Sequence, residues 1–283
     1  MQPIANIVIA CAGVGSRLGM GLPKALVELE GRTIIARLLE ATASVPNCRV
    51  VVGFREDEVT DEVFRARPDA VVVRNPAFLT TSTLTSFRNG AEGLSSKTIF
   101  MDGDLLIRKR EFERFSALAA ASESLFGYCD AVSGDPVYAH ISPRNQILEF
   151  SRTKPSPYEW ASVFCGKPGS LFGSAEISDH RSGTVFERIS ANLPLPGALI
   201  CVAEVDTPAD LEHARSWVAS EPESWTTNPQ GRLNGDYLEI PAPIEPDVTV
   251  HMIPPGPPFA SVAASAGGSR SAQFGKSRIA GKL

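Results

Sequence analysis

The sequence of 283 residues contains no apolar run that approaches the roughly 20 residues needed to span a bilayer. Residues 4–10 form the first apolar run, but it has no basic start and leads into glycines, as a first β-strand does and a signal peptide does not. The five cysteines are scattered without a Cys-x-x-Cys spacing, which argues against a disulfide framework or a zinc site. We therefore expect a soluble protein of the cytoplasm with reduced thiols and no membrane span.

An excess of positive charge is also missing. The formal net charge is −5 at pH 7, which argues against a protein that holds nucleic acid by neutralising its phosphates. Hydrophobic residues make up 43% and charged residues 21% of the chain, as in ordinary globular domains. The length allows one large α/β domain, or one domain with an appendage.

Short β-branched segments alternate with amphipathic ones in the first half of the chain, a pattern typical of a parallel sheet covered by helices. The expected strands lie at residues 4–10, 49–52, 70–73 and 98–101. The expected helices lie near residues 33–44, 56–66 and 84–94. The strands are apolar throughout, so we expect helices on both faces of the sheet. Right-handed crossovers place the loops after these strands at one edge, where such sheets bind ligands.

The second half of the chain is less regular. Its expected elements are a hairpin of residues 137–141 and 146–150, strands at 161–165 and 198–205, and a helix at 208–219 capped by Thr207. Nine of the 22 prolines lie beyond residue 220, and the end of the chain is rich in Ala, Ser and Gly. We therefore predict a folded domain over residues 1–220 and a largely disordered Pro/Gly/Ser-rich appendage over residues 221–283.

A glycine-rich loop with basic residues follows the first predicted strand. Gly13 and Gly15 let backbone N–H groups turn toward a phosphate chain. Arg17 and Lys24 supply the positive charge that binds a triphosphate. The loop is not a Walker motif, because no Gly-Lys-Ser/Thr follows, and Gly19 lies one position too late for the dinucleotide pattern Gly-x-Gly-x-x-Gly. The alternative is a glycine-rich turn with incidental basic residues, but the added Ser-Arg and Pro-Lys favour a phosphate site.

This loop resembles the signature of the nucleotidyltransferase superfamily with a GT-A-like fold, at residues 12–18 (Ala-Gly-Val-Gly-Ser-Arg-Leu) and 23–27 (Pro-Lys-Ala-Leu-Val). The superfamily includes sugar-1-phosphate nucleotidylyltransferases and enzymes of the phosphocholine cytidylyltransferase type. The resemblance implies an α/β fold with a mostly parallel, mixed central sheet, Rossmann-like and covered by helices on both faces. It also implies that the catalytic residues are Arg17 and Lys24, and that the loop residues binding the nucleotide are Ala12, Gly13, Gly15 and Ser16.

A hydroxyl-rich segment after the third predicted strand, residues 75–86, is similar to one in the phosphocholine cytidylyltransferase-like branch. The resemblance implies that Asn75, Thr81, Ser82 and Ser86 bind the nucleotide. Amide and hydroxyl groups at the ligand edge of the sheet suit hydrogen bonds to a base or a ribose. The sequence departs from that branch at Ser82, where Asn is common. The alternative is a capped helix start, since Ser and Thr are favoured there.

Acidic residues follow two predicted strands. Asp102 and Asp104 end the fourth strand, where a carboxylate can bind Mg²⁺, a hard cation that prefers oxygen ligands. The resemblance implies that Asp104 is the metal ligand, whereas Asp102 supports the nucleotide site. Asp206 lies in a Val-Asp-Thr-Pro-x-Asp-Leu pattern, in which the resembling enzymes carry their second metal-binding Asp. The alternative for Asp206 is a simple helix cap, and Asp210 is typical of a first-turn acid.

The acceptor side depends on weaker patterns. Arg152 and Lys154 lie where related enzymes place a basic residue for the acceptor phosphate, and both would point to one face if this segment were a strand. The alternative is a solvated strand edge. Glu187 resembles an acid of the acceptor pocket, where it could bind a cationic or hydroxyl-bearing headgroup. Nearby aromatic side chains could add a cation–π wall, and these are Tyr158, Trp160, Phe164 and Phe186.

Together these features predict an Mg²⁺-dependent nucleotidyltransferase that releases pyrophosphate. The short spacing from Arg17 to Lys24 and the segment 75–86 favour CTP, and a small phosphorylated alcohol or phosphonate as acceptor. The alternatives are a sugar-1-phosphate enzyme that uses UTP, dTTP or GTP, and a non-catalytic nucleotide-binding module. A glycosyltransferase would also explain Asp-Gly-Asp at 102–104, but not the Gly-x-Gly-Ser-Arg…Pro-Lys loop. The oligomeric state stays open, with a homodimer as one possibility.

Overall fold

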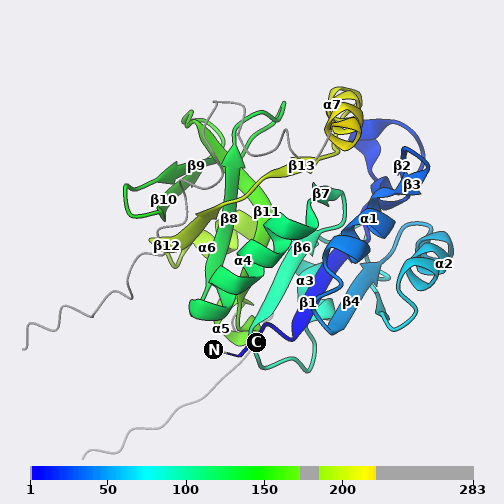
Figure 1. Ribbon diagram of the computed structural model, residues 1–283, viewed down its shortest axis with the longest axis horizontal. Coiled ribbons are helices and arrows are strands. Elements are labelled where there is room, and N and C mark those ends of the chain that lie inside the picture. The colour runs from blue at the N-terminus through cyan, green and yellow to red at the C-terminus, as the bar shows by residue number, and fades with distance from the viewer. Residues whose placement is uncertain (1, 173–184, 221–283) are drawn as a thin grey trace, which may run out of the picture. The chain divides into compact units, whose positions relative to one another are not determined.

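The computed structural model describes residues 2–172 and 185–220, and these residues form a nine-stranded sheet with helices on both faces (Figure 1). One half of the sheet is parallel, in the order β5-β4-β1-β6. Its strands are β1 Asn6–Cys11, β4 Asn47–Val52, β5 Val71–Arg74 and β6 Thr98–Asp102. The chain moves outward from β1 to β5 and returns to the other side of β1 as β6. This change of direction opens a crevice at the carboxyl ends of β1 and β6.

The other half of the sheet is mixed and continues in the order β11-β8-β12-β10-β9. Its strands are β8 Leu125–Asp130, β9 Tyr138–Ile141, β10 Gln146–Ser151, β11 Tyr158–Gly166 and β12 Leu195–Leu199. The strand β11 runs antiparallel to both β6 and β8, whereas β12 runs parallel to β8. The expected mixed sheet is thereby confirmed, as is the hairpin, which is formed by β9 and β10.

Alternate side chains of the strands enter two separate cores. Ile7, Ile9 and Val50 pack on one face beneath α1 Ile34–Ala41, α2 Glu56–Ala66 and α4 Lys109–Ala121. Val8 and Phe100 pack on the other face beneath α3 Thr83–Gly90, α5 Pro168–Phe172 and α6 Val185–Ser190. Because both faces are covered, the strands need apolar residues at every position, which is the pattern seen in the sequence.

Two short strand pairs carry loops of the ligand edge. The strand β7 Leu105–Ile107 pairs with β13 Val202–Glu204, and β2 Glu28–Leu29 pairs with β3 Arg32–Thr33. Helix α7 Pro208–Ala219 follows β13, and Thr207 and Asp210 close its start by a reciprocal capping box. The predicted cap at Thr207 is confirmed. None of the described helices is both long and apolar enough to cross a membrane.

One predicted element is wrong, and two central ones were missed. Residues 198–205 do not form one strand, because the first part pairs with β8 and the second leaves the large sheet to pair with β7. The apolar pattern is continuous across this break, since both parts are buried. The strand β8 and the helix α4 were not predicted at all, although both lie at the centre of the fold. The proposed appendage, residues 221–283, lies outside the described residues.

Candidate active site

The glycine loop connects β1 to two short 3-10 helices, Ser16–Leu18 and Lys24–Leu26. Gly15 has a φ of 66°, and a Cβ at this position would lie 2.9 Å from Cγ of Lys24. A glycine is therefore required for the close approach of Lys24. A cavity of about 250 Å³ opens here, lined by residues that include Gly13, Gly15, Ser16, Arg17 and Lys24.

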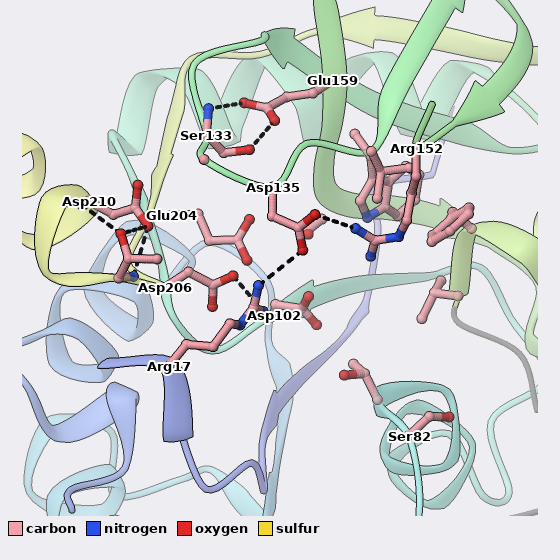
Figure 2. A pocket seen from close by; sticks show the side chains of 18 of the residues that line it. Arg17, Ser82, Asp102, Ser133, Asp135, Arg152, Glu159, Glu204, Asp206 and Asp210 are labelled. Atoms are coloured by element: carbon pink, nitrogen blue, oxygen red, sulfur yellow. Dashed lines mark hydrogen bonds and ion pairs between the residues drawn. The ribbon is translucent and has the colours of Figure 1, made fainter. Parts of the chain in front are cut away.

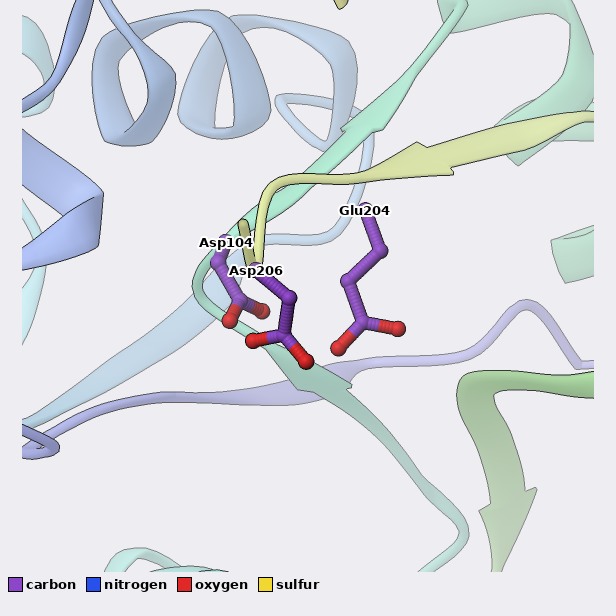
Figure 3. A group of neighbouring side chains, drawn as sticks. All are labelled: Asp104, Glu204 and Asp206. Atoms are coloured by element: carbon purple, nitrogen blue, oxygen red, sulfur yellow. The ribbon is translucent and has the colours of Figure 1, made fainter. Parts of the chain in front are cut away.

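Three carboxylates converge beside this loop (Figure 3). Asp104 follows β6, Glu204 ends β13 and Asp206 precedes α7, and each offers an oxygen within 4.8 Å of the others. Nζ of Lys24 lies 2.7 Å from Oδ2 of Asp104 and also donates to Oδ1 of Asp206. Nη2 of Arg17 lies 2.6 Å from Oδ2 of Asp206. The structure thus brings together the four residues to which the sequence assigns catalysis and metal binding.

Acidic groups outnumber basic groups in this cluster. Burial, followed by repulsion from Asp104, raises the pKa of Asp102 to about 7. Burial, followed by repulsion from Asp104 and Asp102, raises the pKa of Glu204 to about 8. Oδ1 of Asp102 and Oδ1 of Asp104 are buried and accept no hydrogen bond from the described residues. A group of carboxyl oxygens that repel one another when ionised and that include unsatisfied acceptors fits a hard divalent cation.

Glu204 was not predicted as part of this cluster. Its position could have been found from Glu204-Val205-Asp206, because residues two apart in an extended segment point to the same side. Val205 points the other way and is fully buried in the core under α7. Because the side chains alternate, Val205 anchors this segment in the core while Glu204 and Asp206 both face the cavity.

The hydroxyl-rich segment divides into supporting and exposed parts. Asn75 is 1% exposed, and its amide donates to the hydroxyls of Thr81, at 3.0 Å, and Ser86, at 3.1 Å. Asn75 and Ser86 are not among the described residues that line the two cavities, so their contacts give them a role in holding the segment. Thr81 and Ser82 do line the larger cavity. Ser82 precedes α3 without a side-chain capping bond, so its hydroxyl is available to a ligand.

A second cavity, of about 410 Å³, adjoins the carboxylates on the side of the mixed sheet (Figure 2). Its charged lining residues are Arg17, Asp102, Asp135, Arg152, Glu159, Glu204, Asp206 and Asp210, and its aromatic ones are Phe87, Trp160 and Phe186. Two arginines face six carboxyl groups in this list. The cavity therefore suits a ligand that combines an anionic group with a cationic or hydroxyl-bearing one.

The predicted acceptor residues separate in the structure. Arg152 lines the larger cavity, whereas Lys154 pairs with Glu149 on an exposed surface, with 2.7 Å between Nζ and Oε2. The expected same-face pair is wrong, because β10 ends at Ser151 and both basic residues lie in the turn that follows. Glu187 is exposed on α6 and is not among the described lining residues, although its neighbour Phe186 is.

Several lining residues of the larger cavity were not predicted, among them Asp135, Glu159 and Ser162. Ser162 adopts a φ of 52° at a bulge of β11, which is uncommon for a residue with a Cβ. Its hydroxyl lies beside the carboxyl group of Asp102 and lowers the pKa of that group, against the larger opposite effect of burial. No local pattern distinguishes a bulge from regular strand in the sequence, so only the pairing of β11 with two neighbours locates this residue.

Comparison with known proteins agrees with this geometry. The chain is 25% identical over 252 residues to the bifunctional protein GlmU of Thermobifida fusca (strain YX), covering 88% of this chain and 47% of that protein. The chain thus spans about half the length of this curated relative.

Two solved structures share the fold. The CTP:phosphocholine cytidylyltransferase LicC of Streptococcus pneumoniae matches with a TM-score of 0.61 at 14% identity, over 77% of this chain and all of that one. A Bacillus anthracis structure assigned as a glucose-1-phosphate thymidylyltransferase matches with a TM-score of 0.64 at 13% identity, over 76% of this chain and 96% of that one. The model of the MobA-like NTP transferase domain matches residues 7–157, more than half of the chain. The expected nucleotidyltransferase class is therefore confirmed, and the chain belongs to the family of MobA-like NTP transferase domains.

Proposed function

We propose that the chain transfers a CMP group from CTP to a small phosphorylated alcohol or phosphonate, such as phosphocholine or aminoethylphosphonate, and releases pyrophosphate. The observation that carries this proposal is the contact of Lys24 with both Asp104 and Asp206, beside Arg17, at the crevice between β1 and β6. Cations next to a cluster of acids at this edge suit a metal-bound triphosphate. We propose that nucleotide and acceptor are the only substrates, that no nucleic acid is bound, and that the enzyme acts in the cytoplasm.

The reaction needs little acid–base chemistry. An acceptor phosphate oxygen, already ionised, attacks the α-phosphorus while the bond to the bridging oxygen breaks and pyrophosphate leaves. Arg17 and Lys24 stabilise the charge on the phosphates, and the loop that includes Gly15 holds Lys24 in place. Asp104 and Asp206, with Glu204 beside them, would hold Mg²⁺, which neutralises phosphate charge when bound. The described histidines have no part in this scheme.

The lining of the larger cavity supports a headgroup that carries positive charge. The guanidinium of Arg152 lies 5.4 Å from the ring centre of Phe186 and can bind the acceptor phosphate. Trp160 lines the same cavity, where an ammonium group would gain a cation–π contact.

A second candidate is a sugar-1-phosphate nucleotidylyltransferase that uses UTP, dTTP or GTP. The hydroxyls of Thr81, Ser82 and Ser133 line the same cavity and could bind sugar hydroxyls. The Bacillus anthracis structure assigned to glucose 1-phosphate has the same fold.

Pyrophosphate release separates the two candidates. The protein would be incubated with Mg²⁺, each of CTP, UTP, dTTP and GTP, and each of phosphocholine, aminoethylphosphonate and a set of sugar 1-phosphates. We expect release with CTP and one of the two headgroup acceptors. Release only with a sugar 1-phosphate would replace the first candidate by the second, and no release with any pair would contradict both.

A further inference from the structure

A loop of the mixed sheet links the two sides of the active site. Residues 131–137 connect β8 to β9, and Asp135 of this loop lies between two arginines (Figure 2). Oδ1 of Asp135 accepts a hydrogen bond from Nη1 of Arg152 at 3.1 Å. Oδ2 of Asp135 lies 3.5 Å from Nη1 of Arg17. One carboxylate thus joins the arginine of the glycine loop to the arginine that follows β10.

The loop that carries Asp135 is attached to β11. The buried carboxylate of Glu159, 6% exposed, accepts hydrogen bonds from the backbone N–H groups of Val132, at 2.9 Å, and Ser133, at 3.0 Å. The hydroxyl of Ser133 donates to the other oxygen of Glu159. Pro136 follows Asp135 and restricts its backbone to extended conformations. The side chain of Asp135 is exposed, but Glu159 holds the start of the loop that carries it and Pro136 restricts its backbone.

The contact with Asp135 leaves much of Arg152 available. Among the described residues, Arg152 donates to Asp135 through Nη1, so its Nε and Nη2 remain for a second, bidentate contact. Phe186 flanks the same guanidinium, with 5.4 Å to the ring centre. A planar guanidinium held on one edge and one face presents its remaining edge in a defined direction. The larger cavity adjoins it.

Arg17 is held in a similar way from two directions. Its Nη1 faces Asp135 and its Nη2 faces Asp206, whose oxygens also belong to the acidic cluster. A ligand that fixes the side chain of Arg17 would therefore also fix the carboxylate of Asp135. The carboxylate of Asp135 would in turn fix the guanidinium of Arg152.

We propose that Asp135 is a positioning residue that couples the nucleotide side to the acceptor side, so that an ordered Arg17 fixes the orientation of Arg152. The coupling rests on the proposed function, in which Arg17 binds the triphosphate and Arg152 the acceptor phosphate. By reciprocity, bound acceptor also strengthens the binding of nucleotide.

The opposite role for Asp135 would be competition, in which its carboxylate occupies the arginines and weakens the binding of phosphate groups. The two roles predict opposite signs when the carboxylate is removed. Positioning prevails here because Glu159 fixes the loop and because Asp135 contacts only one edge of Arg152. Since the ion pairs of Asp135 are exposed, with 66% of its side chain accessible, we expect an effect of about five-fold rather than a complete loss.

The test compares Asp135→Ala with the matched control Asp69→Ala. Asp69 is equally exposed, at 68%, and also pairs with an arginine, Arg67, but it lies before β5 at the opposite edge of the sheet. The acceptor KM would be measured at low and at saturating nucleotide, with the pair of substrates that releases pyrophosphate. In the wild type we expect saturating nucleotide to lower the acceptor KM about five-fold. In Asp135→Ala we expect the acceptor KM to stay high at both nucleotide concentrations, and in Asp69→Ala to follow the wild type.

A second readout needs no activity. The Nε–Hε signals of arginine side chains would be recorded by NMR and assigned with Arg17→Lys and Arg152→Lys. We expect Asp135→Ala to shift both signals and Asp69→Ala to shift neither, with Asp135→Asn between them because it keeps one hydrogen-bond acceptor.

The proposal is overturned if Asp135→Ala lowers the acceptor KM, which would show competition, or if it follows Asp69→Ala in kinetics or spectra. A wild-type chain that releases no pyrophosphate with any pair contradicts the proposed function instead. In that case the spectra alone decide the positioning role: unchanged Arg17 and Arg152 signals in Asp135→Ala overturn it.

Discussion

The two sides of the active site are built in different ways. On the nucleotide side, the charged residues lie at or after the ends of β1, β6 and β13, and short motifs such as Gly-x-Gly-Ser-Arg present them. On the acceptor side, Asp135, Arg152 and Ser162 come from a loop, a turn and a strand bulge. The first arrangement is prescribed by local backbone requirements. The second depends on how β8, β9, β10 and β11 pair, so its residues can change without altering a motif.

Substitutions in the acidic cluster should lower activity more than substitutions elsewhere in the active site. We expect Asp104→Ala to lower kcat about 10³-fold or more, because a carboxylate that places charge at the transferred phosphate is lost. It should also weaken the rise in Tm that Mg²⁺ produces in the wild-type protein. Pyrophosphate release and thermal melts with and without EDTA would measure both effects. Retained activity would remove Asp104 from its assigned role.

Lys24 is the cation that pairs with these acids, and its substitution tests the same side of the active site. We expect Lys24→Ala to lower kcat about 10²- to 10³-fold, since one preorganised donor to the phosphates disappears. The carboxylates of Asp104 and Asp206 then lose their ion pair, so without metal the variant should melt at a lower temperature than the wild type. Added Mg²⁺ should restore most of that loss. A variant that melts normally without Mg²⁺ would contradict the assigned contact.

Arg152 and Lys154 distinguish the acceptor side from its exposed surroundings. We expect Arg152→Ala to lower kcat/KM for the acceptor about 10- to 100-fold, since a charge-assisted contact to phosphate is lost, while the KM for nucleotide changes much less. Lys154→Ala removes only the exposed pair with Glu149 and should change kcat/KM by no more than about three-fold. Equal losses in the two variants would show that both side chains reach the acceptor.

The same contrast explains how much could be predicted from the sequence. The parallel strands, the glycine loop and the acids after β6 and β13 were found because each depends on periodicity or on a glycine that a close approach requires. Asn75 was found, but its buried hydrogen bonds to Thr81 and Ser86 are not visible in a row of polar residues. The acceptor side was predicted only in part, because contacts such as that of Asp135 with Arg152 depend on tertiary structure.

Ser162 gives the smallest but most specific test. Its φ of 52° disfavours every residue with a Cβ, by about 1 kcal/mol or more, whereas glycine adopts it freely. Ser162→Gly and Ser162→Ala both remove the hydroxyl group that lowers the pKa of Asp102, so we expect the same fall in kcat, about three- to ten-fold. Their stabilities should differ, with Ser162→Gly melting about 2–4 °C above Ser162→Ala because it releases the strain. Equal Tm values for the two variants would show that the backbone at residue 162 is not strained. A kcat that differs between the two variants would show that the backbone of the bulge, and not the hydroxyl, serves the acceptor side.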